Sequence, residues 1–263
     1  MFTTTVAFAF GLTLFAGLST GVGAAIAVLW KNPTDQFLAV SLGFSAGVML
    51  YVSFMEILPE AVEDLSASFG QRGGSWAAVA AFFGGIALIA VIDRLVPDAI
   101  NPHEPAMNET RRRRAMLHMG LLTATAIAIH NFPEGFATFL AGLEDVSIAI
   151  PVAVAIAIHN IPEGIAVAVP LREATGSRKK AFGWAFGSGL AEPVGALVGY
   201  LILLPVLGPT ALGVAFGMVA GIMVFICLDE LLPTAVATGK HHAAIYGLIG
   251  GMAVMALSLL LFL

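Results

Sequence analysis

The sequence His130-Asn131-Phe132-Pro133-Glu134-Gly135 lies inside an apolar stretch, and a related hexapeptide, His159-Asn160-Ile161-Pro162-Glu163-Gly164, lies inside the next one. Residues four positions apart share one face of a helix, so the histidine and glutamate of each copy project together, with the asparagine beside them. Imidazole, carboxylate and amide oxygen are the ligands of a borderline divalent metal. The repeated motif therefore predicts two helices that share a metal site.

The composition indicates a membrane protein. Of 263 residues, 59% are hydrophobic and 11% are charged, whereas a soluble domain carries about a quarter charged residues. The single cysteine, Cys227, excludes an intramolecular disulfide and so argues against a disulfide-stapled secreted scaffold. The net charge of −5 is spread over loops, and the chain has no long basic surface interleaved with aromatic residues. Nucleic acid is therefore not an expected partner.

Apolar stretches long enough to cross a bilayer recur eight times, separated by glycine, proline and asparagine. They predict an all-α polytopic protein with eight transmembrane helices in one transporter domain, residues 1–263. The first stretch has no basic n-region and no clear cleavage site, so we expect a retained helix rather than a signal peptide. The expected helices span residues 6–29, 37–58, 76–92, 116–140, 146–169, 181–204, 212–232 and 243–263.

The basic residues predict the orientation. Alternate loops between transmembrane helices lie on the same side of the membrane. By this rule eleven of the twelve lysines and arginines fall on one side, and only Arg72 falls on the other. By the positive-inside rule this side is cytoplasmic, so both termini face outward and the longest loop, about residues 93–115, is cytoplasmic. The expected location is the cell (inner) membrane, crossed many times. Arg111–Arg114 are interpreted as a topology anchor rather than a patch specific for lipid or nucleic acid.

The opposite loops are acidic, and two interpretations stay open. Their carboxylates either raise the local cation concentration at an outer entrance or are ordinary solvated charges. The acidic residues concerned are Glu60, Glu63, Asp64, Glu144 and Asp145.

A second repeat relates the second and seventh expected helices. Residues 46–61 and 220–235 match at seven of sixteen positions, including a shared Glu-x-Leu-Pro. Five helices apart, the two must cross the membrane in opposite directions, as the fourth and fifth also do. Helices one to three and six to eight are thus predicted to be inverted halves around a central pair, an arrangement typical of transporters. Chance similarity between apolar segments is the alternative.

His130, His159 and Glu192 fall near the middle of their expected helices, at one depth. An ionised carboxylate at that depth costs at least about 2.5–3.5 kcal/mol, and no membrane-embedded lysine or arginine is available to neutralise Glu134, Glu163 and Glu192. A divalent cation is the expected partner, with protonation as the competing solution. Prolines in the three helices, at 133, 162 and 193, are expected to kink them and open a polar cavity. Small residues are expected to permit close helix packing: Gly135, Gly164, Gly187, Gly189 and Gly195.

Other polar residues are weaker candidates. Glu56, Asp229 and Glu230 lie near expected helix ends and are either gate or relay groups or interfacial carboxylates. His241 and His242 either receive a metal at a cytoplasmic exit or mark a helix boundary. His103 in the long loop is either a regulatory metal contact or simply solvated. Cys227 is either a soft ligand near the inner exit or a small buried apolar residue.

With these motifs the chain resembles the ZIP (Zrt-, Irt-like) family of divalent metal transporters, and most closely its bacterial ZupT-like branch, over essentially its whole length. The resemblance implies uptake of Zn2+, and also of Fe2+, Mn2+, Co2+ or Cd2+, into the cytoplasm. It implies a binuclear centre: one metal on His130, Glu134, His159, Glu163 and Glu192, the other on Asn131, Glu134, Asn160, Glu163 and Glu192. The metals are then cargo rather than cofactors, the bilayer is the other partner, and a homodimer is the assembly to consider.

Two other functions were weighed. A metal-sensing receptor without transport is disfavoured by the inverted repeat. An intramembrane metallohydrolase is disfavoured because neither motif is His-Glu-x-x-His and no separate nucleophile or base is evident. We therefore expect no enzymatic activity.

Overall fold

The computed structural model describes residues 4–30, 34–95, 109–144, 146–203 and 209–261, and these are almost entirely helical. The α-helices are α1 (Thr4–Leu29), α2 (Asp35–Val52), α3 (Leu58–Leu95), α4 (Glu109–Glu144), α5 (Val146–Thr175), α6 (Arg178–Gly189), α7 (Ala191–Val198), α8 (Pro209–Ile226), α9 (Leu232–Ala237) and α10 (His241–Leu261). Of three π-helical segments, η1 (Ser53–Ile57) joins α2 to α3, η3 (Cys227–Leu231) joins α8 to α9, and η2 (Gly199–Leu203) follows α7.

The predicted all-α membrane fold is confirmed. Among the described residues, five helical runs are long and apolar enough to cross a membrane, and one of them, Asp35–Ile92, contains both predicted helices 37–58 and 76–92. The chain reverses within this run at Gly70, whose φ of 71° suits a residue without a Cβ. The predicted count of eight crossings stays a prediction.

Several helices are longer than expected. The second predicted helix does not end at residue 58, because helical structure continues through η1 and into α3. Helix α4 starts at Glu109, so Arg113 and Arg114 lie on its first turns and not in a loop. The central part of the predicted cytoplasmic loop, residues 96–108, lies outside the described residues, as do His103 and Asp145.

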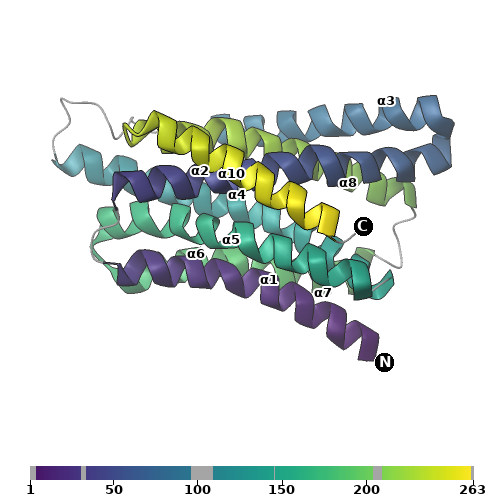
Figure 1. The fold of residues 1–263 in the computed structure, drawn as a ribbon, viewed down its shortest axis with the longest axis horizontal. Coiled ribbons are helices and arrows are strands. Elements are labelled where there is room, and N and C mark those ends of the chain that lie inside the picture. Colours follow the sequence, from purple (N-terminus) through teal and green to yellow (C-terminus); the bar gives the residue numbers. More distant parts are fainter. Residues whose placement is uncertain (1–3, 31–33, 96–108, 145, 204–208, 262–263) are drawn as a thin grey trace.

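The helices form two groups (Figure 1). In one group α3 packs along α8, and α2 packs along α10. In the other, α1 packs along α5, and α4 packs along α5 and α7. Contacts of α5 with α2 and of α4 with α8 join the groups. In addition, Ala126 of α4 and Ala155 of α5 belong to the hydrophobic core of the first group. The start of α1 and the end of α10 lie at the same end of the bundle (Figure 1).

The π-helical segments η1 and η3 support the inverted repeat. Ser53 and Cys227 occupy equivalent positions in the two aligned stretches, and each begins one of these segments. Each segment ends with a backbone hydrogen bond between residues five positions apart, the spacing of a π-helix. Leu58 N–H donates to the Ser53 carbonyl, and Leu232 N–H donates to the Cys227 carbonyl. Pro59 and Pro233 follow directly and cannot donate a backbone hydrogen bond. The same local sequence thus produces the same helix distortion twice.

These distortions correct the predicted placement of the gate candidates. Glu56 lies within η1, while Asp229 and Glu230 lie within η3, so all three are inside continuous helical runs rather than near helix ends. The wide π-turn before each proline lets the chain remain helical where a proline was expected to end the helix.

Candidate metal centre

The two hexapeptides meet in the interior of the bundle, on α4 and α5. The side chains of the first copy, His130, Asn131 and Glu134, are at most 4% exposed, and those of the second copy are at most 1% exposed. Glu192, in the first turn of α7, is completely buried as well. The structure therefore brings together all seven residues that were predicted to form the site.

The histidines and glutamates of the two copies interdigitate. The His130 Nε2 atom lies 3.3 Å from a carboxylate oxygen of Glu134 and 3.7 Å from one of Glu163. The His159 Nε2 atom lies 3.1 Å from the other oxygen of Glu134. Ligand atoms of His130, His159 and Glu163 all lie within 4.8 Å of one another, which is close enough to hold a metal ion.

The asparagines bind the neighbouring helices through their nitrogens. Asn160 Nδ2 donates to the Ala16 carbonyl at 3.0 Å and also to Glu192. Asn131 Nδ2 donates to the Ser188 carbonyl at 3.4 Å. In each asparagine the amide oxygen therefore points away from the carbonyl that the amide nitrogen binds.

Several buried acceptors have no hydrogen-bond partner among the described residues. Those in the candidate centre are both carboxylate oxygens of Glu163, one each of Glu134 and Glu192, and the amide oxygens of Asn131 and Asn160. Leaving a buried polar atom unpaired costs about 1–3 kcal/mol, and more for a charged group. A fold that leaves six such atoms unpaired among the candidate ligands is suited to a ligand that coordinates oxygen, which is what a divalent cation does.

The break between α6 and α7 positions Glu192. Helix α6 ends at Gly189 and α7 begins at Ala191, and Leu190 lies between them with a ψ of −10°. Pro193 has no backbone N–H to donate to the Gly189 carbonyl four residues earlier, which explains why this helix breaks there, as expected. By contrast, α4 and α5 remain continuous helices through Pro133 and Pro162.

An acidic cavity of about 470 Å3 leads to the site. Glu134 and His159 lie at one part of its wall, while Glu56, Glu60, Glu63 and Asp64 line another. Residues of the second half of α4, including Thr138, place it toward the end of the bundle where the termini lie. The interpretation that outer carboxylates gather cations stays a proposal, but their position along a route to Glu134 supports it.

A second cavity, of about 260 Å3, lies toward the other end of the bundle. Asp35, Glu173 and Glu230 contribute its acidic groups, and Ile165 and Leu231 contribute apolar wall. None of the seven central residues lines this second cavity. In this conformation the candidate centre thus opens toward the end of the bundle where the termini lie.

Three further candidates, His241, His242 and Cys227, are not among the seven residues of this centre. His241 and His242 are exposed at the start of α10, with ring centroids 5.5 Å apart. The thiol of Cys227 is buried against the Ala46 carbonyl at 3.6 Å. The roles proposed for these residues stay predictions.

The sequence reasoning missed the contribution of α1. The Ala16 carbonyl holds Asn160, and the Thr20 side chain is completely buried beside Gly189, with a hydroxyl that lacks a hydrogen-bond partner among the described residues. The run of small residues Gly17-Leu18-Ser19-Thr20-Gly21-Val22-Gly23 was the available signal, because such residues mark helix faces that pack closely.

One packing expectation was wrong. Gly135, Gly164, Gly189 and Gly195 each lie directly against backbone of a neighbouring helix, but nothing lies within 4 Å of a Cβ built on Gly187. Gly187 is exposed because it lies on a face of α6 that no helix among the described residues covers.

Comparison with known proteins agrees with this geometry. The sequence model of the family described as ZIP Zinc transporter matches residues 3–114 and 100–259. The chain is 72% identical to the zinc transporter ZupT of Corynebacterium glutamicum over 97% of this chain and 99% of that protein. It is 59% identical to the zinc transporter ZupT of Streptococcus mutans over 97% of each chain, and 53% identical to that of Clostridium perfringens over 98% of this chain and 97% of that protein. The protein is thus a multi-pass membrane protein that belongs to the ZIP family of zinc transporters, a family of transporters rather than enzymes.

Proposed function

We propose that this protein takes up Zn2+ into the cytoplasm through a centre formed by His130, Asn131, Glu134, His159, Asn160, Glu163 and Glu192. The observation that carries the proposal is the convergence of unpaired buried oxygens with two imidazoles at the end of an acidic cavity. The relatives named as zinc transporters support zinc as the cargo.

The donor set supports two ions rather than one. Glu134, Glu163 and Glu192 carry three negative charges when ionised, and the sequence has no lysine or arginine between Arg114 and Arg172 or between Lys180 and Lys240. Two divalent cations leave a net charge of +1 and one leaves −1, so it is the two kinds of donor, and not the charge, that favour two ions. Histidine nitrogens suit one ion, asparagine oxygens suit the other, and the glutamates bridge them. The same mixed ligands suit Fe2+, Mn2+, Co2+ and Cd2+, which we propose as further cargo.

The proposed direction of transport rests on the basic residues. The end of the bundle with Arg113, Arg114 and Lys180 is assigned to the cytoplasm, so the acidic cavity opens outside and both termini lie outside. Cysteines placed at Glu63 and Lys240 test this assignment, because the one native cysteine is buried. Membrane-impermeant maleimide should label the first from outside intact cells and should not label the second.

Transport is tested in proteoliposomes that contain a zinc-sensitive dye. Wild-type protein should give zinc uptake that Cd2+ and Co2+ inhibit and Ca2+ does not, whereas Glu163→Gln should give none. Glu109→Gln, which changes an exposed carboxylate far from the centre, is the matched control. Zinc binding without uptake by the wild-type protein would favour a sensing receptor, and normal uptake by Glu163→Gln would refute the assigned centre.

A further inference from the structure

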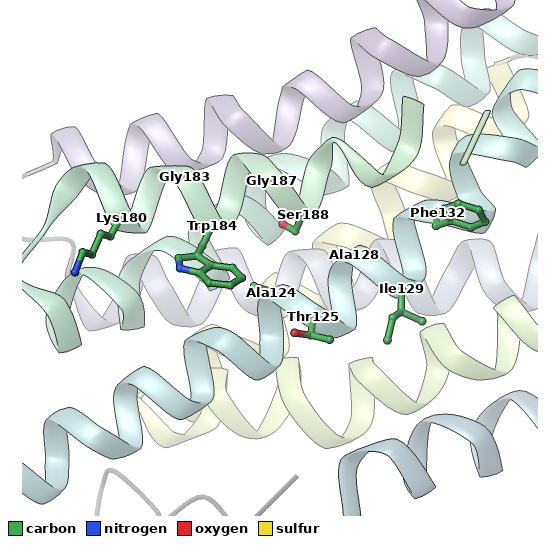
Figure 2. Close-up of a pocket in the computed structure, with 10 residues that line it drawn as sticks. All are labelled: Ala124, Thr125, Ala128, Ile129, Phe132, Lys180, Gly183, Trp184, Gly187 and Ser188. Carbon is green, nitrogen blue, oxygen red and sulfur yellow. The ribbon is translucent and has the colours of Figure 1, made fainter. Parts of the chain in front are cut away.

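A large groove, which none of the seven central residues lines, lies on the surface of the bundle between α4 and α6 (Figure 2). Its volume is about 910 Å3, near the upper limit for sites that bind drug-sized ligands, about 300–1,000 Å3. Ala124, Ala128 and Phe132 of α4 form one wall, and Gly183 and Gly187 of α6 form the other. The wall is thus largely apolar over two turns of both helices.

The two groove glycines differ from the other glycines of the sixth predicted helix. Nothing lies within 4 Å of a Cβ built on Gly183 or Gly187, whereas one built on Gly195 overlaps the Phe132 carbonyl. Gly183 and Gly187 therefore do not bring α6 closer to another part of the protein. Their missing side chains instead leave the groove open toward the surroundings, which in a membrane protein are lipid.

Positive charge lies at one end of the groove. Lys180 lines this end, and Trp184 lies one turn deeper, with its indole 52% exposed (Figure 2). Arg178 and Lys179 precede Lys180, and α4 begins at the same end of the bundle with the exposed Arg113 and Arg114 (Figure 1). Tryptophan and lysine in this order are typical of the boundary between the hydrocarbon and the headgroups.

The dimensions match one leaflet. From Ala124 to Phe132 the α4 wall rises about 12 Å at about 1.5 Å per residue, and one leaflet contributes about 15 Å to a hydrocarbon core of about 30 Å. An acyl chain that starts beside Trp184 and runs toward Phe132 would cover the apolar wall. Its headgroup would then lie beside Lys180.

We propose that this groove binds an anionic phospholipid of the leaflet at the Lys180 end, with an acyl chain along Gly183 and Gly187 and the phosphate region beside Lys180. Charge decides between this occupant and a second copy of the chain. A two-fold axis along the membrane normal would bring Arg178, Lys179 and Lys180 of both copies together. Like charges at such a contact oppose dimerisation, whereas an anionic headgroup neutralises them.

The test uses full-length protein released from nanodiscs that contain equal amounts of phosphatidylglycerol and phosphatidylcholine, with retained lipid measured by native mass spectrometry. The wild type should retain phosphatidylglycerol over phosphatidylcholine by at least about fivefold, because one lysine near a surface contributes about that factor. Lys180→Gln should lower the preference about fivefold. Lys240→Gln, which removes an exposed lysine outside the groove, should leave it unchanged.

The groove itself is tested with Gly183→Leu/Gly187→Leu, which should remove the retained lipid by filling the space. Gly84→Leu/Gly250→Leu is the matched control, since both of these glycines also face open space but lie outside the groove. Equal lipid preference in Lys180→Gln and wild type would overturn the proposal, as would retained lipid in the filled variant. A disulfide between two copies of Trp184→Cys in membranes would identify a second copy as the occupant instead.

Discussion

Gly17 of α1 and Gly189 of α6 lie against each other where the two helices cross. A Cβ built on Gly17 would lie 2.6 Å from the Gly189 carbonyl oxygen, and one built on Gly189 would lie 2.5 Å from the Gly17 carbonyl oxygen. Such reciprocity is expected for contacts at a two-fold axis. The inverted repeat inferred from the second and seventh predicted helices therefore extends to the first and sixth.

Three other pairs of contacts obey the same relation. Gly23 lies against the Ile161 carbonyl as Gly195 lies against the Phe132 carbonyl. Gly164 lies against the Thr20 carbonyl as Gly135 lies against the Glu192 carbonyl. Asn160 donates to the Ala16 carbonyl as Asn131 donates to the Ser188 carbonyl. In this relation the counterpart of Glu192 is Thr20, so the centre has a carboxylate on one side of the axis and a hydroxyl on the other.

The helix crossings give the first prediction. Gly23→Ala and Gly195→Ala should each lower the free energy of unfolding by about 1–3 kcal/mol or more, because the added methyl group meets backbone that cannot move away. Thermal unfolding in detergent measures this. Gly84→Ala and Gly250→Ala face open space and serve as controls. Equal melting temperatures in the two pairs would contradict the packing described here.

The second prediction concerns metal binding and stability. Zinc should raise the melting temperature of the wild type, because an ion that binds only the folded state at about 100 times its Kd contributes about 2.7 kcal/mol. Glu163→Gln should weaken zinc binding by more than about tenfold and so remove at least about half of the shift. Glu109→Gln, at an exposed position outside the acidic cavity, should retain it. A chelator should reverse the shift in the wild type.

The acidic cavity gives the third prediction. Glu56→Gln/Glu63→Gln should lower the initial rate of zinc uptake at low ionic strength, by up to about tenfold, because carboxylates along the route raise the local cation concentration. High salt should remove the difference by screening it. The maximal rate at saturating zinc should change little. A loss that is independent of salt would indicate instead that these residues bind zinc directly or gate its passage.

The fourth prediction uses the Thr20 hydroxyl. Thr20→Val should leave the free energy of unfolding unchanged or raise it, since the hydroxyl has no hydrogen-bond partner among the described residues and valine has a similar shape. Thr13→Val is the comparison, because the Thr13 hydroxyl donates to the Ala9 carbonyl at 3.1 Å. Only the Thr13 variant should lose a hydrogen bond. Destabilisation by Thr20→Val would show that this hydroxyl has an unrecognised partner.

Much of the centre was predictable from the sequence. The spacing of His130 with Glu134, and of His159 with Glu163, fixes their common face on any helix, and strong hydrophobicity on both sides fixes the helices themselves. Glu192 could be added because its helix lacks any basic residue to pair with it. These inferences depend on helix geometry and on the cost of placing a charge in hydrocarbon. Neither depends on how the helices pack against one another.

Helix ends were less predictable, because hydropathy shows where the apolar stretch ends but not whether the helix continues beyond it. The continuation through Glu56 into α3 depends on a π-turn that precedes Pro59, and proline alone suggests an end or a kink. The role of Gly187 was also misjudged, since glycine looks the same in a sequence whether it faces a helix or lipid.

By itself, the sequence determined the all-α membrane fold, the inverted repeat and the seven candidate ligands, because helix periodicity and burial of charge are short-range constraints. Only the tertiary structure decided which backbone each glycine contacts, that α1 holds Asn160, and that the centre opens toward the acidic cavity. Those relations join residues of different helices, 144 positions apart for Asn160 and Ala16, and packing between helices, which no local pattern encodes, determines them.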